Sequence, residues 1–269
     1  MAELKKTPCK IEIDQDLCAG CGECVNVCGS RVLRLDEKTG KATVLGEGIC
    51  CGHCFAICPT GAIKMHDTTS SSVAAATPAA VTYEDMAALI RERRAVRHFK
   101  PEKVSKEDLN EILTDLRYAP TACNNMDIAY IVVDDAATLD TVRAMTVEGL
   151  KKDKKFAKRA MTLNKDDKCV CGSQQLLIIE GPMAPPFYDW AIAMEHFEMI
   201  AQTKGIRTCW AGFVSIALQS SAEFRQFLRD KGAARGPEGA YGYYAMMFGY
   251  PEENYVRVPP RPNPPTLWI

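Results

Sequence analysis

The pattern of apolar positions predicts a regularly folded region that begins near residue 83. Two capping boxes, Thr82 with Asp85 and Ser105 with Asp108, each precede apolar residues at helical spacing. Pro120 should end the second of these helices, because proline lacks an N–H donor and clashes with the preceding turn. The apolar stripes of the two predicted helices are Met86, Leu89 and Ile90, then Leu109, Ile112, Leu113 and Leu116.

Further along the chain, apolar runs and helical periodicity alternate. Buried strands are predicted over 129–133, 176–179 and 241–249, and a long helix over 187–204 is closed by Gly205. The proline-rich tail from Val258 should be extended. Helices and strands are both abundant, so the region from 83 to 269 is predicted to be an α+β domain.

The first part of the chain has a different character. Residues 1–66 are rich in cysteine and glycine, whereas residues 67–82 are mostly Ser, Thr and Ala without periodicity. The second stretch is typical of a flexible linker. We therefore expect a small domain over 1–66, a linker over 67–82 and a larger domain over 83–269.

Composition limits the function. Of the 269 residues, 47% are hydrophobic and 25% are charged, as in ordinary globular proteins, and the net charge of -1 argues against nucleic-acid binding. No apolar run reaches the length of a membrane span, and no secretion signal is visible, so we expect a cytoplasmic protein. Nine of the 13 cysteines lie within the first 58 residues. In a reducing cytoplasm, such density indicates metal ligands or redox chemistry rather than disulfides.

The N-terminal cysteines form two runs with similar spacing. They are Cys18-x-x-Cys21-x-x-Cys24-x-x-x-Cys28 and Cys51-x-x-Cys54-x-x-x-Cys58-Pro59. In bacterial ferredoxins the first three cysteines of a run hold one 4Fe–4S cluster, and the fourth ligates the other cluster. The region resembles the two-cluster ferredoxins over nearly its whole length, which implies a pseudo-symmetric βαββαβ-like fold. Cluster one then takes Cys18, Cys21, Cys24 and Cys58, and cluster two takes Cys28, Cys51, Cys54 and one more ligand.

The fourth ligand of cluster two does not follow the regular spacing. Regular spacing would put a cysteine at position 48, but Gly48 stands there and Cys50 follows two residues later. Cys50 is the candidate for the missing ligand, and a three-cysteine cluster with an open or unusual iron is the alternative. Structural zinc is a further alternative, but zinc sites usually use four ligands in two CxxC-like pairs, which two interlocked runs fit less well.

Arg93, Arg94 and Arg97 gather in one short segment of the second domain. Their spacing places the side chains on one helical face, and guanidinium groups bind phosphate with paired hydrogen bonds. Taken alone, this pattern fits a solvated basic helix end better than a phosphate site.

Four motifs in the same order as in the nitroreductase family change that interpretation. The arginine segment resembles the family's "RRSxRxF", although Ala95 replaces the serine, and Ala119–Asn124 resembles "APSxxN", although Met126-Asp127 replaces the following "QP". Gly205–Gly212 resembles "GLGxcwiG". Near the end, Gly249-Tyr250-Pro251 and Pro260-Arg261-Pro262 resemble "GyP" and "pRrp".

This resemblance implies an α+β sandwich that binds FMN at a homodimer interface. It implies that Arg93, Arg94, Arg97 and Arg261 hold the phosphate beside Ala95, and that Asn124 binds the edge of the flavin ring. The backbone of Cys209, Trp210, Ala211 and Gly212 would lie against the ring, with an N–H near N5 that stabilises the reduced, anionic flavin. Flavin chemistry needs no protein nucleophile, so no catalytic residue is assigned.

Together, these features predict an iron–sulfur flavin oxidoreductase. Electrons would pass from a low-potential donor, such as ferredoxin or NAD(P)H, through two 4Fe–4S clusters to FMN. The acceptor would be a small electron-poor molecule, such as a nitroaromatic, quinone or enone. A non-enzymatic electron carrier or redox sensor, and a different flavin reaction such as dehydrogenation, are the alternatives.

Two further features are open to more than one interpretation. Cys169-x-Cys171 is either a redox or metal pair or two ordinary thiols, and ordinary thiols are favoured because no second pair is nearby. The run Lys151–Lys155 is either a solvated helix face or a docking site for an acidic electron donor, and the solvated face is favoured.

Overall fold

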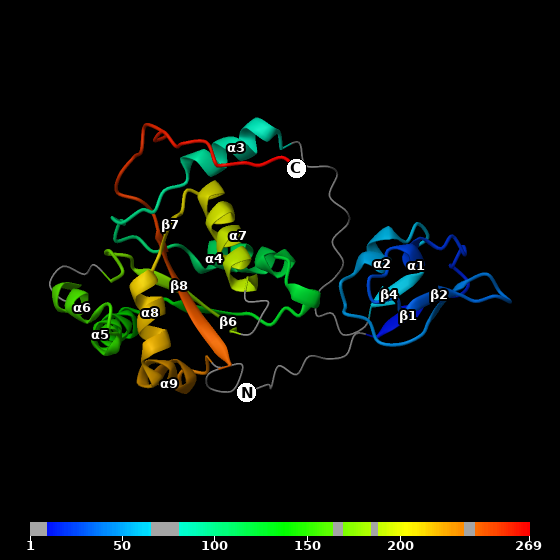
Figure 1. The fold of residues 1–269 in the computed structure, drawn as a ribbon, viewed down its shortest axis with the longest axis horizontal. Coiled ribbons are helices and arrows are strands. Elements are labelled where there is room, and N and C mark those ends of the chain that lie inside the picture. The colour runs from blue at the N-terminus through cyan, green and yellow to red at the C-terminus, as the bar shows by residue number, and fades with distance from the viewer. Residues whose placement is uncertain (1–9, 66–80, 164–168, 184–187, 234–239) are drawn as a thin grey trace. The chain divides into compact units, whose positions relative to one another are not determined.

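The computed structural model describes residues 10–65, 81–163, 169–183, 188–233 and 240–269. These residues form two compact units (Figure 1). The first unit takes the described residues up to 65 together with the segment Thr121–Met126, and the second takes the rest. The predicted linker lies outside the described residues up to residue 80.

The first unit consists of two small two-stranded sheets and two short helices. Its elements in chain order are β1 (Ile11–Ile13), α1 (Glu23–Asn26), β2 (Leu33–Leu35), β3 (Ala42–Val44), α2 (His53–Ile57) and β4 (Ile63–Met65). β1 pairs antiparallel with β4, and β2 pairs antiparallel with β3. This order confirms the expected βαββαβ arrangement.

Glycine starts both helices of the first unit. Gly22 and Gly52 precede α1 and α2 with φ values of 79° and 76°, a left-handed conformation that glycine adopts without steric cost. The buried apolar cluster of this unit is small and includes Cys24 and Cys54 themselves. A core of this size supplies little stability, so the cysteine sites must contribute to it.

The second unit is built around a four-stranded antiparallel sheet with the strand order β5-β6-β8-β7. The strands are β5 (Ala129–Val133), β6 (Gln175–Pro182), β7 (Arg207–Trp210) and β8 (Tyr241–Gly249). Nearly every residue of β6 and β8 is buried, because helices cover both faces of the sheet. Neighbouring residues of these strands therefore point into two different cores.

One core contains Leu176 and Ile178 of β6 and lies beneath α5 (Ala136–Lys152), α6 (Ala157–Leu163), α8 (Gly212–Ser220) and α9 (Ala222–Asp230). The other contains Leu177 and Ile179 and lies beneath α4 (Lys106–Asp115), the 3-10 turn η1 (Leu116–Tyr118) and α7 (Asp189–Thr203). Helix α3 (Tyr83–Glu92) packs beside α7 (Figure 1). The sandwich architecture expected for this domain is confirmed.

Gly149 brings α5 and α8 close together. A Cβ atom built on this glycine would lie 2.8 Å from Cβ and 2.9 Å from the carbonyl oxygen of Ala217, both nearer than such atoms normally approach. Only glycine therefore allows this helix crossing. The crossing fixes α8, whose first turn forms part of the candidate site.

The local predictions compare well with these elements. The capping box of Thr82 and Asp85 is present, and the Ser105 side chain accepts a hydrogen bond from the Asp108 N–H at the start of α4. The predicted strands at 129–133 and 241–249 have the bounds observed, whereas 176–179 was too short. The motif at 205–212 contains a strand that the apolar pattern did not indicate, and α5, α6, α8 and α9 were also not predicted.

None of the described helices combines the length and the apolar character needed to cross a bilayer.

Candidate iron–sulfur and flavin sites

The first unit contains a cavity lined by Cys18, Cys21, Cys24 and Cys58. These are the four cysteines that the spacing assigned to cluster one. Backbone amides donate to two of the sulfurs: Ala42 N–H to Cys18 Sγ at 3.5 Å and Ala62 N–H to Cys58 Sγ at 3.3 Å. Hydrogen bonds of this kind stabilise thiolate sulfur and tune the potential of a cluster.

Burial acts on these thiols before any metal binds. Burial, reinforced by neighbouring cysteines, raises the pKa of Cys24 above its usual value. Burial also opposes ionisation of Cys58, but the hydrogen bonds from Thr60 and Ala62 outweigh it and lower the pKa of Cys58. Binding of a metal cluster must therefore displace a proton from Cys24.

A second cavity is lined by Cys28, Cys50, Cys51 and Cys54, together with Gly48. It gathers the three cysteines assigned to cluster two and the candidate replacement. Cys50 has a positive φ of 57° and takes part in a disulfide in this structure. A sulfur in a disulfide cannot act as a thiolate ligand at the same time, so ligation by Cys50 requires this bond to open. Its role as the fourth ligand stays a prediction.

Asn124 belongs to this first unit. Its side-chain amide donates to the carbonyl oxygens of Ile49 and Cys50, at 3.3 and 2.9 Å. Cys123, Asn124 and Met126 all have positive φ values near 50°, which is unusual for residues with a side chain. Asn124 therefore links a constrained segment, 121–126, to the loop of the second cavity.

In the second unit, a cavity of about 270 Å³ lies where β7 meets α8. It is lined by the whole segment from Cys209 to Gly212 and by Arg97, and also by Phe213 of α8. The Ala211 N–H is not available to a ligand, because it donates to the Ala245 carbonyl oxygen at 2.8 Å. Since α8 begins at Gly212, the N–H groups of its first turn have no carbonyl partner within the helix. Gly212 and Phe213 of this first turn line the cavity.

Three cysteines line the same cavity: Cys169, Cys171 and Cys209. Cys169 and Cys209 are buried, whereas Cys171 is half-buried. Burial raises the pKa of Cys209, although the positive charge of Arg97 partly opposes this effect. The thiol of Cys209 is therefore protonated at neutral pH.

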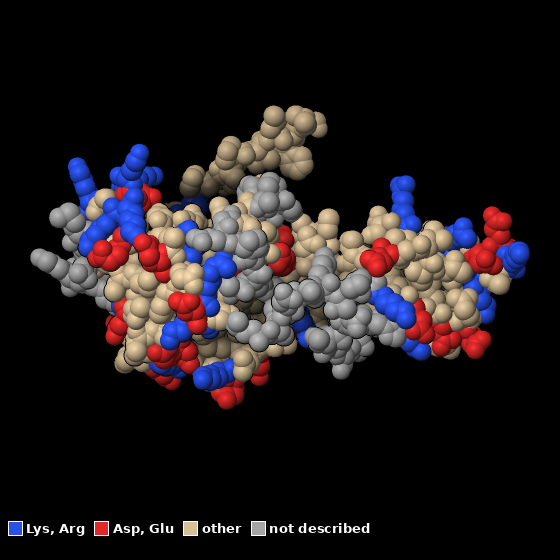
Figure 2. Space-filling view, turned by 90° about the horizontal axis from the view of Figure 1, so that it is seen from below, with Lys and Arg blue, Asp and Glu red and all other residues tan. Residues whose placement is uncertain are grey.

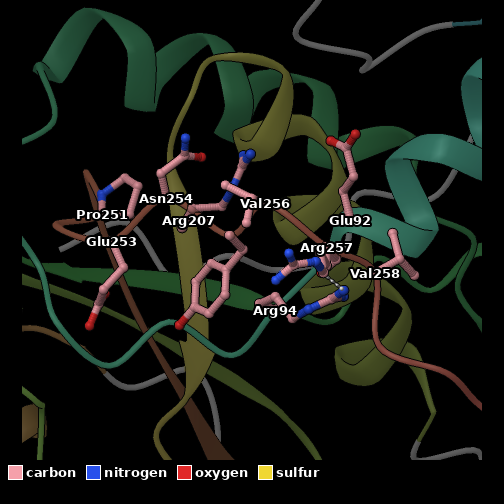
Figure 3. A pocket seen from close by; sticks show the side chains of 10 residues that line it. Glu92, Arg94, Arg207, Pro251, Glu253, Asn254, Val256, Arg257 and Val258 are labelled. Atoms are coloured by element: carbon pink, nitrogen blue, oxygen red, sulfur yellow. Dashed lines mark hydrogen bonds between the residues drawn. The ribbon is translucent and has the colours of Figure 1, made fainter.

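A second cavity of this unit, of about 290 Å³, is bordered by three arginines (Figure 3). Arg94 follows α3, Arg207 begins β7 and Arg257 lies in the C-terminal segment. Arg94 and Arg257 lie side by side, and the Arg94 guanidinium donates to the Arg257 carbonyl at 3.3 Å. Glu92 and Glu253 line the same cavity, so its three guanidinium groups exceed its carboxylates by one. Guanidinium groups bind phosphate with paired hydrogen bonds, so this excess of positive charge is suited to an anion such as a phosphate.

Comparison with known proteins agrees with this geometry. The model of the nitroreductase family matches residues 90–250. The chain belongs to the nitroreductase family. A 4Fe-4S binding domain model matches residues 10–33.

Individual relatives support both assignments. A ferredoxin from Pyrobaculum islandicum is 43% identical over 67 residues, or 24% of this chain, and the match spans only 59% of that ferredoxin. An uncharacterized ferredoxin from Methanocaldococcus jannaschii is 41% identical over 59 residues, which are 20% of this chain and 92% of the ferredoxin. The fold is similar to that of a nitroreductase with bound FMN from Bacteroides fragilis, with a TM-score of 0.59 and 23% identity over 69% of this chain and 98% of the other. The N-terminal part of this nitroreductase-family chain is thus a ferredoxin domain, and its oxidoreductase class is confirmed.

Within the nitroreductase-family domain, the arginine motif runs beside β7. Ala95 forms a parallel bridge with Thr208, and the Val96 N–H donates to the Thr208 carbonyl at 3.0 Å. This pairing places Arg94 at one cavity and Arg97 at the other. The sequence motif therefore has a structural cause, since one extended segment serves both cavities.

The remaining arginines of the prediction are placed differently. Arg93 lies 3.4 Å from the carboxylate of buried Glu198, which also accepts a hydrogen bond from the Thr208 hydroxyl at 2.5 Å. Arg261 is exposed and borders neither of the two cavities. Their roles at the phosphate stay predictions.

The sequence did not predict a role for four of the residues that line these cavities. Arg207 stands where the family motif has its second glycine, which is a visible signal. Arg257 lies just before the proline-rich tail, four residues before Arg261. Cys169 and Cys171 were taken for ordinary thiols because their nearness to Cys209 depends on the fold.

Proposed function

We propose that this chain is an FMN-dependent oxidoreductase that delivers electrons from a low-potential donor, through two 4Fe–4S clusters, to a small electron-poor organic acceptor. The observation that carries the proposal is the joint presence, in one chain, of two cavities lined by four cysteines each and of a nitroreductase-family domain with a phosphate-suited cavity. A nitroaromatic, a quinone or an enone fits the acceptor class.

The residues present fit FMN. Arg207 and Cys209 lie two positions apart on β7, so their side chains point to the same face of the strand, about 7 Å apart. The cavity with Arg207 and the cavity with Cys209 therefore lie along one strand. In the proposed arrangement, Arg94, Arg207 and Arg257 hold the phosphate and the wall from Cys209 to Gly212 receives the ring.

FMN, when bound, supplies two-electron and one-electron chemistry. The chain's own groups then bind and orient the ring. The first-turn N–H groups of α8 and the guanidinium of Arg97 place partial and full positive charge along the cavity, which favours an anionic ring. Glu198 holds Arg93 and Thr208 in place behind β7 and so positions this wall.

Steady-state turnover tests the proposal. The full chain, loaded anaerobically with FMN and clusters, should reduce nitroaromatics or quinones faster with reduced ferredoxin as donor than with NADH or NADPH. Turnover only with the nicotinamides would contradict the electron path through the clusters. Absence of turnover with every acceptor would favour the carrier or sensor alternative.

The metal content tests the two clusters separately. We expect about eight iron atoms and about eight labile sulfides per chain. Cys50→Ser should lower iron in the second site, whereas Cys123→Ser, which removes an exposed cysteine of the same unit, should not. Full iron content in Cys50→Ser would refute Cys50 as a ligand.

A homodimer is part of the proposal. Tyr83, Met86 and Ile90 of α3 are all exposed, and Leu267 and Trp268 of the C-terminal segment are 84% and 91% exposed. Large apolar side chains that are exposed together usually mark an interaction surface. Light scattering should give twice the mass of 29.7 kDa, and a monomer in solution would contradict this part.

A further inference from the structure

Cys171 and Cys209 come together although 37 positions of sequence separate them. Both line the cavity of about 270 Å³ at the junction of β7 and α8, and both pack in the same apolar cluster on one side of the sheet. Met247 of β8 pairs with Cys209 and with Leu176, and Cys171 packs against the apolar cluster that contains both of them. The fold therefore concentrates thiols at one ligand cavity.

The backbone at Cys171 is constrained. Cys171 has a φ of 50°, and Gly172 follows with a φ of 76°. A residue with a side chain adopts this left-handed region at an energetic cost, and such strain tends to be kept where it positions a functional group. Here it accompanies a half-buried thiol that lines the same cavity as the buried thiol of Cys209.

We propose that Cys171 and Cys209 form a reversible disulfide that exchanges an electron pair with the flavin in this cavity. This inference rests on the proposed function, because it needs the flavin ring in the same cavity. Formation of the disulfide breaks two S–H bonds and makes one S–S bond. The two electrons and two protons released pass to oxidised flavin, and the reverse reaction returns them to the thiols.

The surroundings of Cys209 suit this exchange. Burial raises the pKa of the Cys209 thiol, whereas the positive charge of Arg97 opposes this effect and favours the thiolate, which is the reactive form. Both Cys171 and Arg97 act electrostatically on Cys209, in opposite directions. The pair would give the protein a store for two electrons beside the flavin, in addition to the single electrons that the clusters carry.

Peptide analysis tests the disulfide directly. The full chain with FMN and clusters is divided under anaerobic conditions, and one portion receives a quinone acceptor while the other receives dithionite. Both are denatured in the presence of iodoacetamide and digested with trypsin. Peptide 208–225 contains Cys209 alone, and peptide 169–204 contains Cys169 and Cys171. We expect the two peptides to be linked in the quinone-treated portion and alkylated separately in the dithionite-treated portion.

Matched variants identify the partner. Cys171→Ser and Cys209→Ser should each abolish the linked peptide, whereas Cys169→Ser, which changes a third thiol of the same cavity, should retain it. A link that persists in Cys171→Ser and disappears in Cys169→Ser would overturn the assignment of Cys171. Bound FMN, released and measured by absorbance, verifies that each variant is folded. Cys171→Ala and Cys209→Ala replace any serine variant that fails to bind FMN.

Electron counting gives an independent measurement. Dithionite titration of the oxidised wild-type protein should consume about two electron equivalents more than titration of Cys171→Ser with the same FMN and iron content. Equal consumption would refute the exchange. Wild-type protein that binds FMN but shows no linked peptide refutes the disulfide alone, whereas wild-type protein that binds no FMN refutes the proposed function.

Discussion

Replacement of Arg207 by glutamine should weaken the binding of FMN but not that of riboflavin, which lacks the phosphate. Arg207 is half-buried at the arginine-lined cavity, and its guanidinium donates to the Gln202 carbonyl at 3.2 Å. This anchor to the backbone orients the side chain before a ligand arrives. Glutamine keeps a polar side chain of shorter reach and removes the charge.

The size of the effect follows from the setting of the site. A hydrogen bond to a charged partner contributes about 1.5–3 kcal/mol. Arg94 and Arg257 remain in the variant and the cavity is open to solvent, so the lower part of this range applies. A loss of ~1.5–2 kcal/mol corresponds to a Kd for FMN that is roughly twelve- to thirtyfold higher. The difference should shrink at high ionic strength, because salt screens exposed charges.

Quenching of flavin fluorescence on titration of the FMN-free protein measures both affinities. Arg117→Gln is the matched control, because Arg117 is exposed and lies over the ring of Tyr118, away from either cavity. An equal loss of affinity for FMN and riboflavin would show that Arg207 acts on the fold rather than on the phosphate. Unchanged affinity for FMN would refute the phosphate site itself.

Three further predictions concern stability and cluster loading. Gly149→Ala should lower the free energy of unfolding by about 1–3 kcal/mol, because the added methyl group meets Ala217; a stability in urea equal to or above that of the wild type would contradict the close helix crossing. A hydrogen bond from Lys152 lowers the pKa of Glu223 to about 2 from 4.5, so this pair stabilises the fold above pH 4.5 and the stabilisation is lost as the pH falls towards 2. Glu223→Gln should therefore flatten the acid limb of the stability curve, and an unchanged limb would count against the pair. Cys58→Ser should reduce bound iron by roughly half, since it removes one ligand from cluster one only; loss of all iron would mean that the two sites do not assemble independently.

The surface charge around the run Lys151–Lys155 bears on its two interpretations. On the face shown in Figure 2, acidic and basic side chains are interspersed. Lys151 and Lys152 pair with Glu148 and Glu223 at 2.5 and 2.7 Å. These ion pairs support the interpretation of a solvated helix face over that of a docking site for an acidic donor.

Local signals in the sequence determined much of this protein. The capping residues Thr82 and Ser105 act on N–H groups three positions away, so they mark helix starts in any fold. The cysteine runs likewise carry their own geometry, and the seven regularly spaced cysteines are divided between two separate cavities in the way that their spacing predicts. Short-range hydrogen bonds and covalent spacing need no knowledge of distant segments.

Only the tertiary structure decided which distant residues share a cavity. Strand β7 was hidden within a motif because its four residues show little alternation, and it forms by pairing with β8. That pairing brings Arg207 towards Arg94 and Arg257, and Cys209 towards Cys171. In the same fold, Arg93 pairs with Glu198 and lines neither cavity. Such neighbours are set by the register of a sheet and the packing of helices over it, and no local pattern in the chain encodes them.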